Sequence, residues 1–405
     1  MERKRCTANK LLIKNIQIYA ENEMIETGYI KIAEDKIVEM GSVHELKEDG
    51  RFGEIIIPKG YKIIPGLIDV HIHGVDGADT MDGTTEALDT MAKALPKEGT
   101  TSFLATTITQ DKEAIEKALV NVSRYCSMVG KAEVLGLHLE GPFINRKMAG
   151  AQPVNHIINP EIALFKKWQK LSRDSIRIVT LAPELPGALE LIKYLIEQGI
   201  VASIGHSDAT YEDVTSAIRV GATQVTHLFN QMRGLHHREP GVVGAALLHQ
   251  ELRAELIVDG IHVDPEIVKL AYRQKDTKGL ILITDSMRAK CLKNGSYDLG
   301  GQEVQVSGGK AILKDGTLAG SILKLSNAVK NIMEYADCTL ADAVEMASVN
   351  PAKQLNLFDC KGSIEIGKDA DLVILDDKDD VFMTFCRGKL AFKKEGMGTD
   401  ETKSS

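Results

Sequence analysis

The sequence predicts an α/β protein in which a (β/α)₈ barrel of the TIM type carries a small β-sandwich domain built from both chain termini. Between residues 65 and 359, eight short apolar runs alternate with segments of helical periodicity. Such runs are typical of parallel strands that are buried on both faces. Outside that region, apolar and polar residues alternate between turn residues, which indicates half-buried strands. We therefore expect residues 1–64 and 360–405 to form the sandwich and residues 65–359 to form the barrel.

The two terminal segments are expected to pair with each other. Residues 11–64 contain three strand-like stretches, LLIKNIQIYA, GYIKIAEDKIVEMG and EIIIPKGYKIIP. The stretch from Gly362 behaves likewise, with GSIEIGKDADLVILDD followed by VFMTFCRGKLAFKK. Because the two ends of a domain often lie close together, these segments can share one small sandwich.

The eight central runs supply the strands of the barrel, and marked helix starts follow several of them. Asn159-Pro160, Asp264-Pro265 and Asn350-Pro351 place a proline at the first position of an expected helix. Eight strand–helix units in a region of this length match a TIM barrel. An open, doubly wound sheet is the alternative, but it does not explain the polar residues at the run ends. The runs are IIPGLIDVHIHG, TTSFLATT, EVLGLHLEG, IRIVTLAPE, VASIGHS, TQVTHLFN, AELIVDGIHV and GLILITDS.

Composition and charge narrow the classes of function. Hydrophobic residues make up 43% and charged residues 26% of the 405 residues, which is ordinary for a globular protein. No apolar run approaches the roughly 20 residues that cross a bilayer. The basic start, MERKRCTANK, leads into an alternating segment and not into the unbroken core of a signal peptide. A net charge of −8 argues against nucleic-acid binding. We expect neither a membrane nor a nucleic acid as a partner.

The cysteines indicate a reducing compartment. They are scattered and form no C-x-x-C pair, which argues against a disulfide framework or a structural zinc knuckle. The expected location is therefore the cytoplasm. The six cysteines are Cys6, Cys126, Cys291, Cys338, Cys360 and Cys386.

Residues that can bind a metal ion or move a proton follow the apolar runs, where function sits in barrels of this kind. His71 and His73 are two residues apart, so on a strand both point to the same side. Four histidines and two carboxylates at one rim would be costly without a partner, because buried polar groups need hydrogen bonds or a cation. A divalent metal is such a partner. The six residues are His71, His73, Glu140, His206, His227 and Asp285.

A structural role is the alternative for each of these residues alone. A single histidine at a strand end is more often a hydrogen-bonded core residue than a ligand, and His138 is interpreted in this way. Five of the six residues are ligand candidates from four separate strand ends, and together they favour a metal site: His71, His73, Glu140, His206 and His227. Nitrogen and carboxylate ligands suit Zn²⁺, Fe²⁺, Co²⁺ or Mn²⁺ and do not choose among them.

Several motifs resemble a known enzyme superfamily. PGLIDVHIHG (65–74) resembles the first-strand motif of the amidohydrolase superfamily, whose members share a metal-bearing barrel and a small β-sandwich. GSIEIGKDADLVIL (362–375) resembles the return of that superfamily into the sandwich. The middle of the chain is similar to the N-acetylglucosamine-6-phosphate deacetylase family. These motifs are HLEGPF (138–143), GHSDA (205–209), THLFNQM (226–232), REPGVVGAAL (238–247), DGIHV (259–263) and TDS (284–286).

The resemblance implies one or two divalent metal ions per subunit. Glu140, His206 and His227 would hold the principal ion, and His71 with His73 would hold a second one. Many binuclear relatives bridge their metals with a carboxylated lysine at the end of the fourth strand. Here that strand reads IRIVTLAPE and ends without a lysine, which leaves Glu140 as the bridging carboxylate.

The resemblance also implies the reaction, which is hydrolysis of the acetamide of N-acetyl-D-glucosamine 6-phosphate to glucosamine 6-phosphate and acetate. Asp285 would be the catalytic residue, taking a proton from the water and later giving one to the departing amine. A further metal ligand or a helix cap is its alternative role. Alternative activities are deacetylation of the galactosamine isomer or hydrolysis of another amide, and a non-catalytic barrel protein is an alternative of another class.

The same resemblance assigns residues to the phosphorylated amino sugar. Arg238, His262 and the backbone amides around Asn230 and Gln231 would bind the phosphate. The arginine would come from a neighbouring subunit, which implies a homodimer; a solvated loop cation is its alternative role. Gln152 stands where several relatives have a histidine near the acetyl carbonyl, so a second metal would support the developing oxyanion. The remaining expected substrate contacts are Ala151, Leu318, Ala319 and Gly320.

Overall fold

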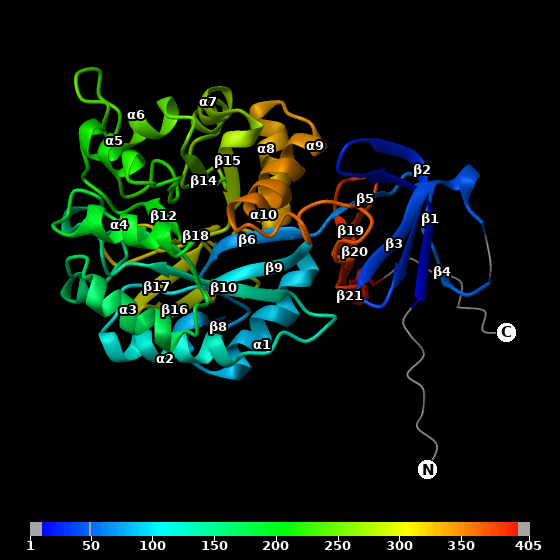
Figure 1. The fold of residues 1–405 in the computed structure, drawn as a ribbon, viewed down its shortest axis with the longest axis horizontal. Coiled ribbons are helices and arrows are strands. Elements are labelled where there is room, and N and C mark those ends of the chain that lie inside the picture. The colour runs from blue at the N-terminus through cyan, green and yellow to red at the C-terminus, as the bar shows by residue number, and fades with distance from the viewer. Residues whose placement is uncertain (1–9, 48–49, 396–405) are drawn as a thin grey trace, which may run out of the picture.

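The computed structural model describes residues 10–47 and 50–395 and confirms the predicted barrel (Figure 1). In this part of the chain, eight parallel strands form one sheet in the order β15-β14-β13-β12-β11-β10-β9-β6. The first and last strands meet because the Asp285 N–H donates to the His71 carbonyl at 2.8 Å. The strands are β6 (Leu67–Ile72), β9 (Thr100–Thr106), β10 (Glu133–Glu140), β11 (Ile176–Leu181), β12 (Val201–Ile204), β13 (Gln224–Val225), β14 (Arg253–Ile257) and β15 (Leu280–Ile283).

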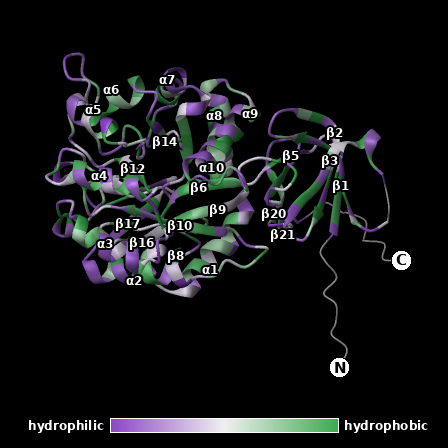
Figure 2. Ribbon diagram, viewed as in Figure 1, coloured by the Kyte–Doolittle hydropathy of each residue, from purple (hydrophilic) through white to green (hydrophobic). Residues whose placement is uncertain are grey.

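Helices surround the barrel and cover the outer faces of its strands (Figure 1). Every residue of β6, β9, β12 and β15 is buried, as expected for strands that are covered on both faces. In Figure 2 the strands β6 and β9 are mostly hydrophobic, whereas the helices carry many hydrophilic residues. None of the helices in the described residues has the length and apolar character needed to span a lipid bilayer. The helices are α1 (Thr85–Ala94), α2 (Lys112–Arg124), α3 (Ile162–Leu171), α4 (Ala188–Glu197), α5 (Tyr211–Arg219), α6 (Gly241–Leu248), α7 (Pro265–Lys275), α8 (Leu325–Ala336), α9 (Leu340–Val344) and α10 (Asn350–Gln354).

The proline-marked helix starts agree with the structure at one position and differ at another. Asp264 caps α7 as predicted, since its carboxylate accepts a backbone N–H of the first turn at 2.9 Å, and Pro265 is the first helical residue. The prediction for Asn159-Pro160 is wrong by two residues. There α3 begins at Ile162, because Glu161 still has an extended backbone.

The third predicted start, Asn350-Pro351, lies inside a longer helical run. A π-helical turn over 345–349 joins α9 to α10, so α10 continues an existing helical run and Asn350 does not cap a free helix end. The Asn350 side chain donates instead to the carbonyls of Thr277 and Leu280, at 2.7 and 2.8 Å. Its polar group therefore ties this helical run to β15.

Both ends of the chain contribute to a second sheet beside the barrel, as predicted (Figure 1). Its main path runs β21-β20-β19-β5-β1-β2-β3, with β4 paired to β1. N-terminal and C-terminal strands share one core, in which the rings of Tyr61 and Phe382 meet edge to face at 4.9 Å between centroids. The strands are β1 (Lys10–Tyr19), β2 (Met24–Ala33), β3 (Lys36–Ser42), β4 (Gly53–Ile56), β5 (Lys62–Pro65), β19 (Leu372–Leu375), β20 (Val381–Cys386) and β21 (Lys389–Lys393).

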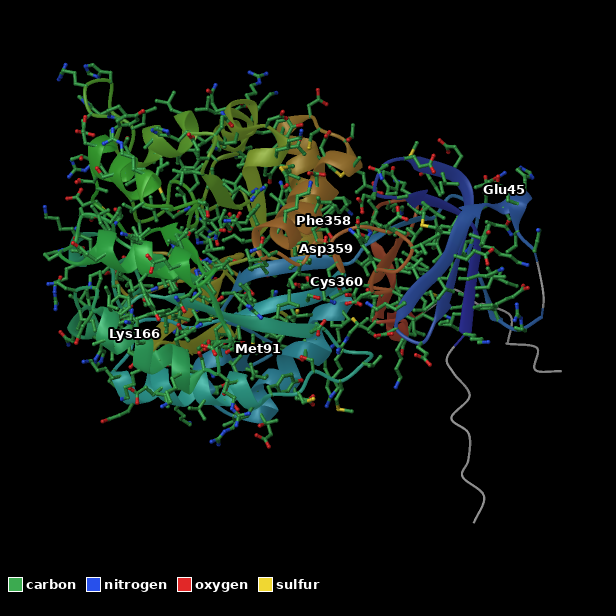
Figure 3. All side chains as sticks on the ribbon, viewed as in Figure 1. Glu45, Met91, Lys166, Phe358, Asp359 and Cys360 are labelled. Atoms are coloured by element: carbon green, nitrogen blue, oxygen red, sulfur yellow. The ribbon has the colours of Figure 1, made fainter. Side chains whose placement is uncertain are left out.

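Ion pairs hold the second sheet against the barrel. The chain leaves the barrel through residues 358–360, which are labelled in Figure 3. Directly after them, the ammonium group of Lys361 lies 2.7 Å from carboxylate oxygens of Glu133 and Asp369 and 2.6 Å from Asp371. Glu133 opens β10 of the barrel, whereas Asp369 and Asp371 lead into β19, so one lysine joins the two sheets.

A small antiparallel sheet that the sequence analysis did not predict follows β15. Its side chains Leu299 and Val304 form a hydrophobic cluster with Ile108 and Ala319 of the barrel loops. Gly300, in the turn between its first two strands, has a φ of 58°, and a Cβ there would lie 3.2 Å from Ile108. The insertion therefore packs closely on the loop that follows β9. The strands of this sheet, and of a short hairpin after β6, are β16 (Gly295–Leu299), β17 (Gln302–Ser307), β18 (Lys310–Ile312), β7 (Gly74–Val75) and β8 (Ala78–Asp79).

Candidate active site

The predicted metal ligands meet at the C-terminal ends of the barrel strands. His71 is part of β6 and His73 follows it, so the period of the strand turns both side chains to the same side. Glu140 is the last residue of β10. All three side chains are buried.

Three further site residues share one backbone geometry. His206, His227 and Asp285 each follow a barrel strand by two residues, after β12, β13 and β15. Their φ angles are 47°, 31° and 47°, in the left-handed region that residues with a side chain rarely adopt. Strained backbone of this kind persists only where the surrounding structure holds it, and it gathers at functional sites.

Glu140, His206 and His227 place three ligand atoms around one point. Glu140 Oε1 lies 3.2 Å from Nε2 of each histidine, and the two Nε2 atoms are 3.1 Å apart. Ligand atoms that are bonded to one metal ion at roughly 2 Å lie about 3 Å from one another. The spacing therefore fits a metal ion.

Hydrogen bonds on the far side of each ring fix the tautomers of these histidines. His206 Nδ1 lies 2.7 Å from the Met148 carbonyl oxygen, and His227 Nδ1 lies 3.1 Å from the Asn230 carbonyl oxygen. A carbonyl oxygen only accepts, so each Nδ1 carries a hydrogen, and the neutral form of each ring turns its lone pair at Nε2 toward Glu140. Three acceptors that face one another require a cation between them, and a divalent metal fits.

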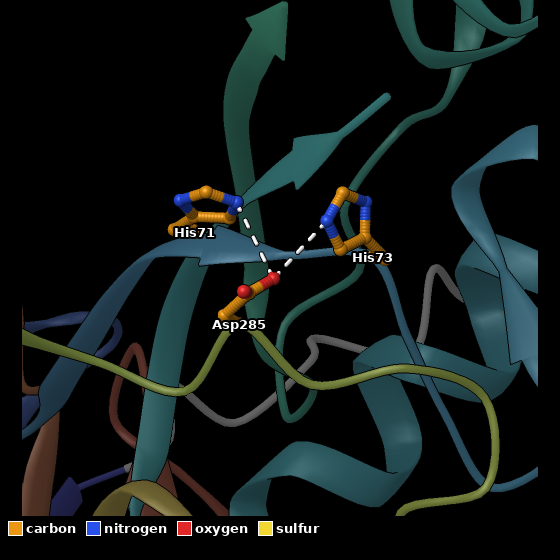
Figure 4. A group of neighbouring side chains, drawn as sticks. All are labelled: His71, His73 and Asp285. Atoms are coloured by element: carbon orange, nitrogen blue, oxygen red, sulfur yellow. Dashed lines mark ion pairs between the residues drawn. The ribbon is translucent and has the colours of Figure 1, made fainter. Parts of the chain in front are cut away.

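A second group of ligand-type side chains, His71, His73 and Asp285, lies beside the first (Figure 4). Asp285 Oδ1 is 3.5 Å from His71 Nε2 and 3.2 Å from His73 Nε2. Glu140 joins the two groups, since its oxygens lie 3.4 Å from His71 Nε2 and 3.3 Å from His73 Nε2. Among the described residues, none forms a well-directed hydrogen bond with His71 Nε2 or Asp285 Oδ1. These buried atoms also fit a cation.

Burial and mutual charge set the protonation of these side chains in the metal-free protein. Burial lowers the pKa of His73, but the close contacts with the Asp285 and Glu140 carboxylates outweigh it and raise the pKa to about 10. Burial raises the pKa of Asp285, but the charge of His71 and the close contact with His73 outweigh it and lower the pKa to about 2. For Glu140 burial is likewise outweighed, by His71 and the other histidines, so its pKa lies well below the ordinary value. Both carboxylates are charged at neutral pH.

Gln152 lies against the bridging carboxylate. Its side-chain N–H donates to Glu140 Oε2 at 2.7 Å, and its Oε1 accepts the Thr109 backbone N–H at 2.7 Å. The amide is thereby fixed at both ends. Gln152 holds Glu140 in place as well as facing the cavity.

Most predicted site residues line one cavity between these side chains. His262 reaches it with its ring fixed, because His262 Nδ1 lies 2.7 Å from Asp259 Oδ2. The Asn230 backbone N–H already donates to the His227 carbonyl at 2.9 Å. The lining residues are His73, Ile108, Glu140, Ala151, Gln152, His206, His227, Asn230, Gln231, His262, Asp285, Leu299, Leu318 and Gly320.

Three predicted site residues are not part of that lining. His71 and Ala319 are fully buried next to residues that line the cavity. Arg238 is exposed on the loop between β13 and α6, which projects from the barrel at the upper left of Figure 1. Within one chain the structure does not bring Arg238 to the cavity, so its role in phosphate binding stays a prediction.

Sequence reasoning missed two apolar residues of the cavity, Ile108 and Leu299. Ile108 follows β9 by two residues, the same place that His206 holds after β12, so its position in the run was a usable signal. Leu299 belongs to the small sheet after β15, and no pattern in the sequence connects that segment to the cavity.

Comparison with known proteins agrees with this geometry. The model of the amidohydrolase family matches residues 63–391. An N-acetylglucosamine-6-phosphate deacetylase of Bacillus subtilis (strain 168) is 50% identical over 95% of this chain and 98% of its own length. An N-acetylgalactosamine-6-phosphate deacetylase of Escherichia coli O157:H7 is 39% identical over 81% of this chain and 87% of its own. The crystal structure of N-acetylglucosamine-6-phosphate deacetylase from Pasteurella multocida superposes with a TM-score of 0.89 at 30% identity, covering 94% of this chain and 99% of that one. From fold, site and sequence together, the chain belongs to the amidohydrolase family.

Proposed function

We propose that this protein hydrolyses the acetamide of N-acetyl-D-glucosamine 6-phosphate to glucosamine 6-phosphate and acetate. The observation that carries the proposal is the convergence of Glu140, His206 and His227 on one point, with Asp285 beside them. In the reaction, the oxygen of water bonds to the amide carbon and the carbon–nitrogen bond breaks. The departing nitrogen takes up a proton that the water released. Relatives that are named for this reaction reach 50% identity with the chain.

The metal requirement follows from the ligand set. Glu140, His206 and His227 would hold one ion, and His71, His73 and Asp285 a second, with Glu140 between them. Bound there, a divalent metal lowers the pKa of water toward ~7 and polarises the amide carbonyl. Imidazole and carboxylate ligands suit Zn²⁺, Fe²⁺, Co²⁺ or Mn²⁺ equally, and we propose one or two such ions per subunit.

Asp285 is the proposed general base and acid. It is the more open of the two carboxylates, since its side chain is 12% exposed and that of Glu140 only 2%. Its lowered pKa keeps it ionised at neutral pH, so its carboxylate can accept the proton of the attacking water. The protonated group then lies within the same cavity to return that proton to the leaving amine.

The phosphorylated sugar would occupy the cavity beside this site. His262 and the segment Asn230–Gln231 line the side on which we place the phosphate, and Leu318 and Gly320 line the side of the sugar. The Asn230 backbone N–H already donates to the His227 carbonyl. The proposed donors from that segment are therefore the backbone N–H of Gln231 and the side-chain amide of Asn230. Arg238 would complete the phosphate site of a neighbouring subunit, which makes the proposed assembly a homodimer.

The acetyl carbonyl would lie near Gln152 and Ala151. One N–H of the Gln152 amide is used by Glu140, and an amide has a second one that can donate to the substrate. A neutral amide stabilises a developing oxyanion less than a charged group does. The ion at His71 and His73 would supply the rest of that stabilisation.

An acetate-release assay tests the proposed reaction. The purified, metal-loaded protein is given N-acetylglucosamine 6-phosphate, its galactosamine isomer, and N-acetylglucosamine without phosphate. We expect the highest kcat/KM with the glucosamine phosphate and a strong drop without the phosphate. No acetate from any of the three would contradict the proposal and favour a non-catalytic barrel.

The galactosamine isomer is the second candidate substrate. The E. coli relative that is named for that isomer shares 39% identity with this chain, so the fold and the metal ligands alone do not select one sugar. A higher kcat/KM with the galactosamine phosphate would assign the protein to that activity. Hydrolysis of a different amide by the same ligands is the remaining alternative.

Two further proposals concern organisation and location. We divide the chain into a barrel over residues 65–359 and a sandwich over residues 1–64 and 360–405. The second sheet, formed by strands from both ends of the chain, supports this division. The scattered cysteines support a cytoplasmic location.

A further inference from the structure

Glu255 carries a buried carboxylate that has no part in the proposed reaction. It lies in the middle of β14 and is fully buried. Its Oε2 is 2.9 Å from His71 Nδ1 and accepts the His227 backbone N–H at 3.3 Å. Its Oε1 accepts the side-chain N–H of Gln224 at 2.7 Å. Because both oxygens are held by different neighbours, the carboxylate has one orientation, and that orientation faces His71.

Glu255, His71 and His138 lie close enough together to suggest a third metal site. The hydrogen bonds of His138 argue against one. His138 Nδ1 is 2.9 Å from the Val70 carbonyl and His138 Nε2 is 2.7 Å from Thr180 Oγ1, so both ring nitrogens are occupied. Burial, with the nearby charge of His71, lowers the pKa of His138 to about 4, which keeps the ring neutral. Within this group, Glu255 is hydrogen-bonded to His71, and the His138 ring packs edge to face on His71 at 4.6 Å between centroids.

We propose that Glu255 is a positioning residue for the metal ion at His71, His73 and Asp285. By accepting the Nδ1 hydrogen of His71, it selects the tautomer whose Nε2 lone pair faces the site. Without this acceptor the ring could carry its hydrogen on Nε2 and present a donor where a cation binds. The inference rests on the proposed function, because it needs the second ion site.

Two substitutions of Glu255 separate its charge from its hydrogen bond. Among the described residues, Gln224 Oε1 has no hydrogen-bond partner. In Glu255→Gln the Gln224 amide can therefore turn over and accept from the new N–H, while the new oxygen still faces His71. This variant removes the charge and keeps the shape. Glu255→Leu removes the acceptor altogether.

The test is a zinc titration of the full chain against a competing chelator, with a circular dichroism spectrum of each variant. Partners of metal-bound histidines typically contribute about 10- to 100-fold in metal affinity. We expect Glu255→Leu to lower the affinity for the second zinc ion, at His71, His73 and Asp285, by that factor. The affinity for the first ion, at Glu140, His206 and His227, should not change. Glu255→Gln should recover part of the loss. Should Glu255→Leu fail to fold, Glu255→Met, which also lacks the acceptor, takes its place in the titration, and wild-type affinity of that variant for the second ion overturns the inference.

A tautomer measurement adds a readout that a merely structural role would not change. In zinc-loaded protein with ¹⁵N-labelled histidine, His71 should show a protonated Nδ1 in the wild type and lose that signature in Glu255→Leu. Glu98→Gln is the matched control, because Glu98 is a buried carboxylate that pairs instead with Lys290 at 2.8 Å. It should leave the zinc stoichiometry unchanged.

The outcomes distinguish this inference from the proposed reaction. Two zinc ions and acetate release in the wild type, with equal zinc affinity in all variants, would overturn only the role of Glu255. No acetate release, with the expected loss of the second ion, would overturn only the reaction. A wild type that binds a single zinc ion overturns the inference itself.

Discussion

Asp285 belongs to the barrel through its backbone and to the site through its side chain. Its N–H donates to the His71 carbonyl and its carbonyl accepts the Ser321 N–H, both at 2.8 Å. Gly320 approaches so closely that a Cβ there would lie 3.0 Å from the Asp285 carbonyl oxygen. These contacts hold the residue independently of its charge. A neutral replacement should therefore keep its place.

Replacing Asp285 with asparagine tests its role in proton transfer. We expect Asp285→Asn to lose at least about 100-fold in kcat, because the amide cannot accept the proton of the water. The ion at Glu140, His206 and His227 should remain, which metal analysis of the purified variant checks. Asp298→Asn, an exposed carboxylate of the β16 strand, is the control. A rate near that of the wild type would remove Asp285 from the mechanism.

Metal affinity should depend on pH, because protons and metal compete for the same nitrogens. The pKa of His73 in the metal-free protein is about 10, so at neutral pH a bound metal must displace a proton. Affinity therefore rises with pH below that value, by about tenfold per pH unit for each displaced proton. Calorimetry in buffers of different ionisation enthalpy counts the released protons. Metal affinity that does not change between about pH 6 and pH 8 would contradict the raised pKa of His73.

At the scale of single residues, the sequence predicted which residues lie at the site better than it predicted the hydrogen-bond partners around them. The six ligand-type residues follow apolar runs, and strand ends gather at one rim for any closed parallel barrel. Glu255 was visible as a lone carboxylate inside an apolar run, AELIV. Its partners His71 and Gln224 lie on other strands. No local pattern could therefore show which hydrogen bonds make its burial tolerable.

Among the elements, the small sheet after β15 contributes most to the site beyond the barrel itself. Gln302 of β17 donates its side-chain N–H to the Ala151 carbonyl at 2.5 Å, and Gln110 donates to Gly300 at the turn. The sheet thus holds the loop that carries Ala151 and Gln152. An insertion of this kind is absent from the repeating pattern of strands and helices, which is why the sequence analysis did not predict it.

Removing one of these hydrogen bonds should weaken catalysis without affecting the metal. We expect Gln302→Ala to lower kcat/KM about 2- to 10-fold, corresponding to a net hydrogen bond of about 0.5–1.5 kcal/mol. The metal content should not change. Gln305→Ala is the matched control, because Gln305 lies on the same strand and is exposed. Equal losses in both variants would show that the sheet, and not this contact, determines the effect.

The helix starts show why element boundaries are harder to predict than elements. Asp264 caps its helix, as its sequence pattern indicates, because its carboxylate accepts the Glu266 N–H at 2.9 Å. Asn350 has the same local pattern, but its side-chain N–H groups donate to the Thr277 and Leu280 carbonyls. Tertiary contacts decided the second case, and such contacts come from residues distant in sequence.

At the scale of the whole molecule, Lys361 is the main electrostatic link between the barrel and the second sheet. Its side chain is 5% exposed, and three carboxylates surround its ammonium group. Burial raises the pKa of Asp371, and the charge of Lys361 opposes that rise. Removing the lysine would leave Asp371, whose side chain is 7% exposed, without this counter-charge, whereas Asp369 keeps Lys36 and Glu133 keeps Arg387.

We expect Lys361→Met to lower the free energy of unfolding by about 3–5 kcal/mol, because a broken buried ion pair leaves an uncompensated charge. Urea denaturation followed by circular dichroism measures the change. Lys353→Met is the control: its ammonium group pairs with Glu345 at 3.3 Å and its side chain is 39% exposed, so the loss should stay below about 1 kcal/mol. Similar losses in the two variants would argue against the buried link.

The hydrogen bond from the Asp285 backbone N–H to the His71 carbonyl lies where the first strand of the barrel meets the last. During synthesis, all of the histidine ligands and α7 leave the ribosome before Asp285, the proposed base. Activity thus requires that β15 has docked onto β6. A chain that ends before β15 lacks the proposed base.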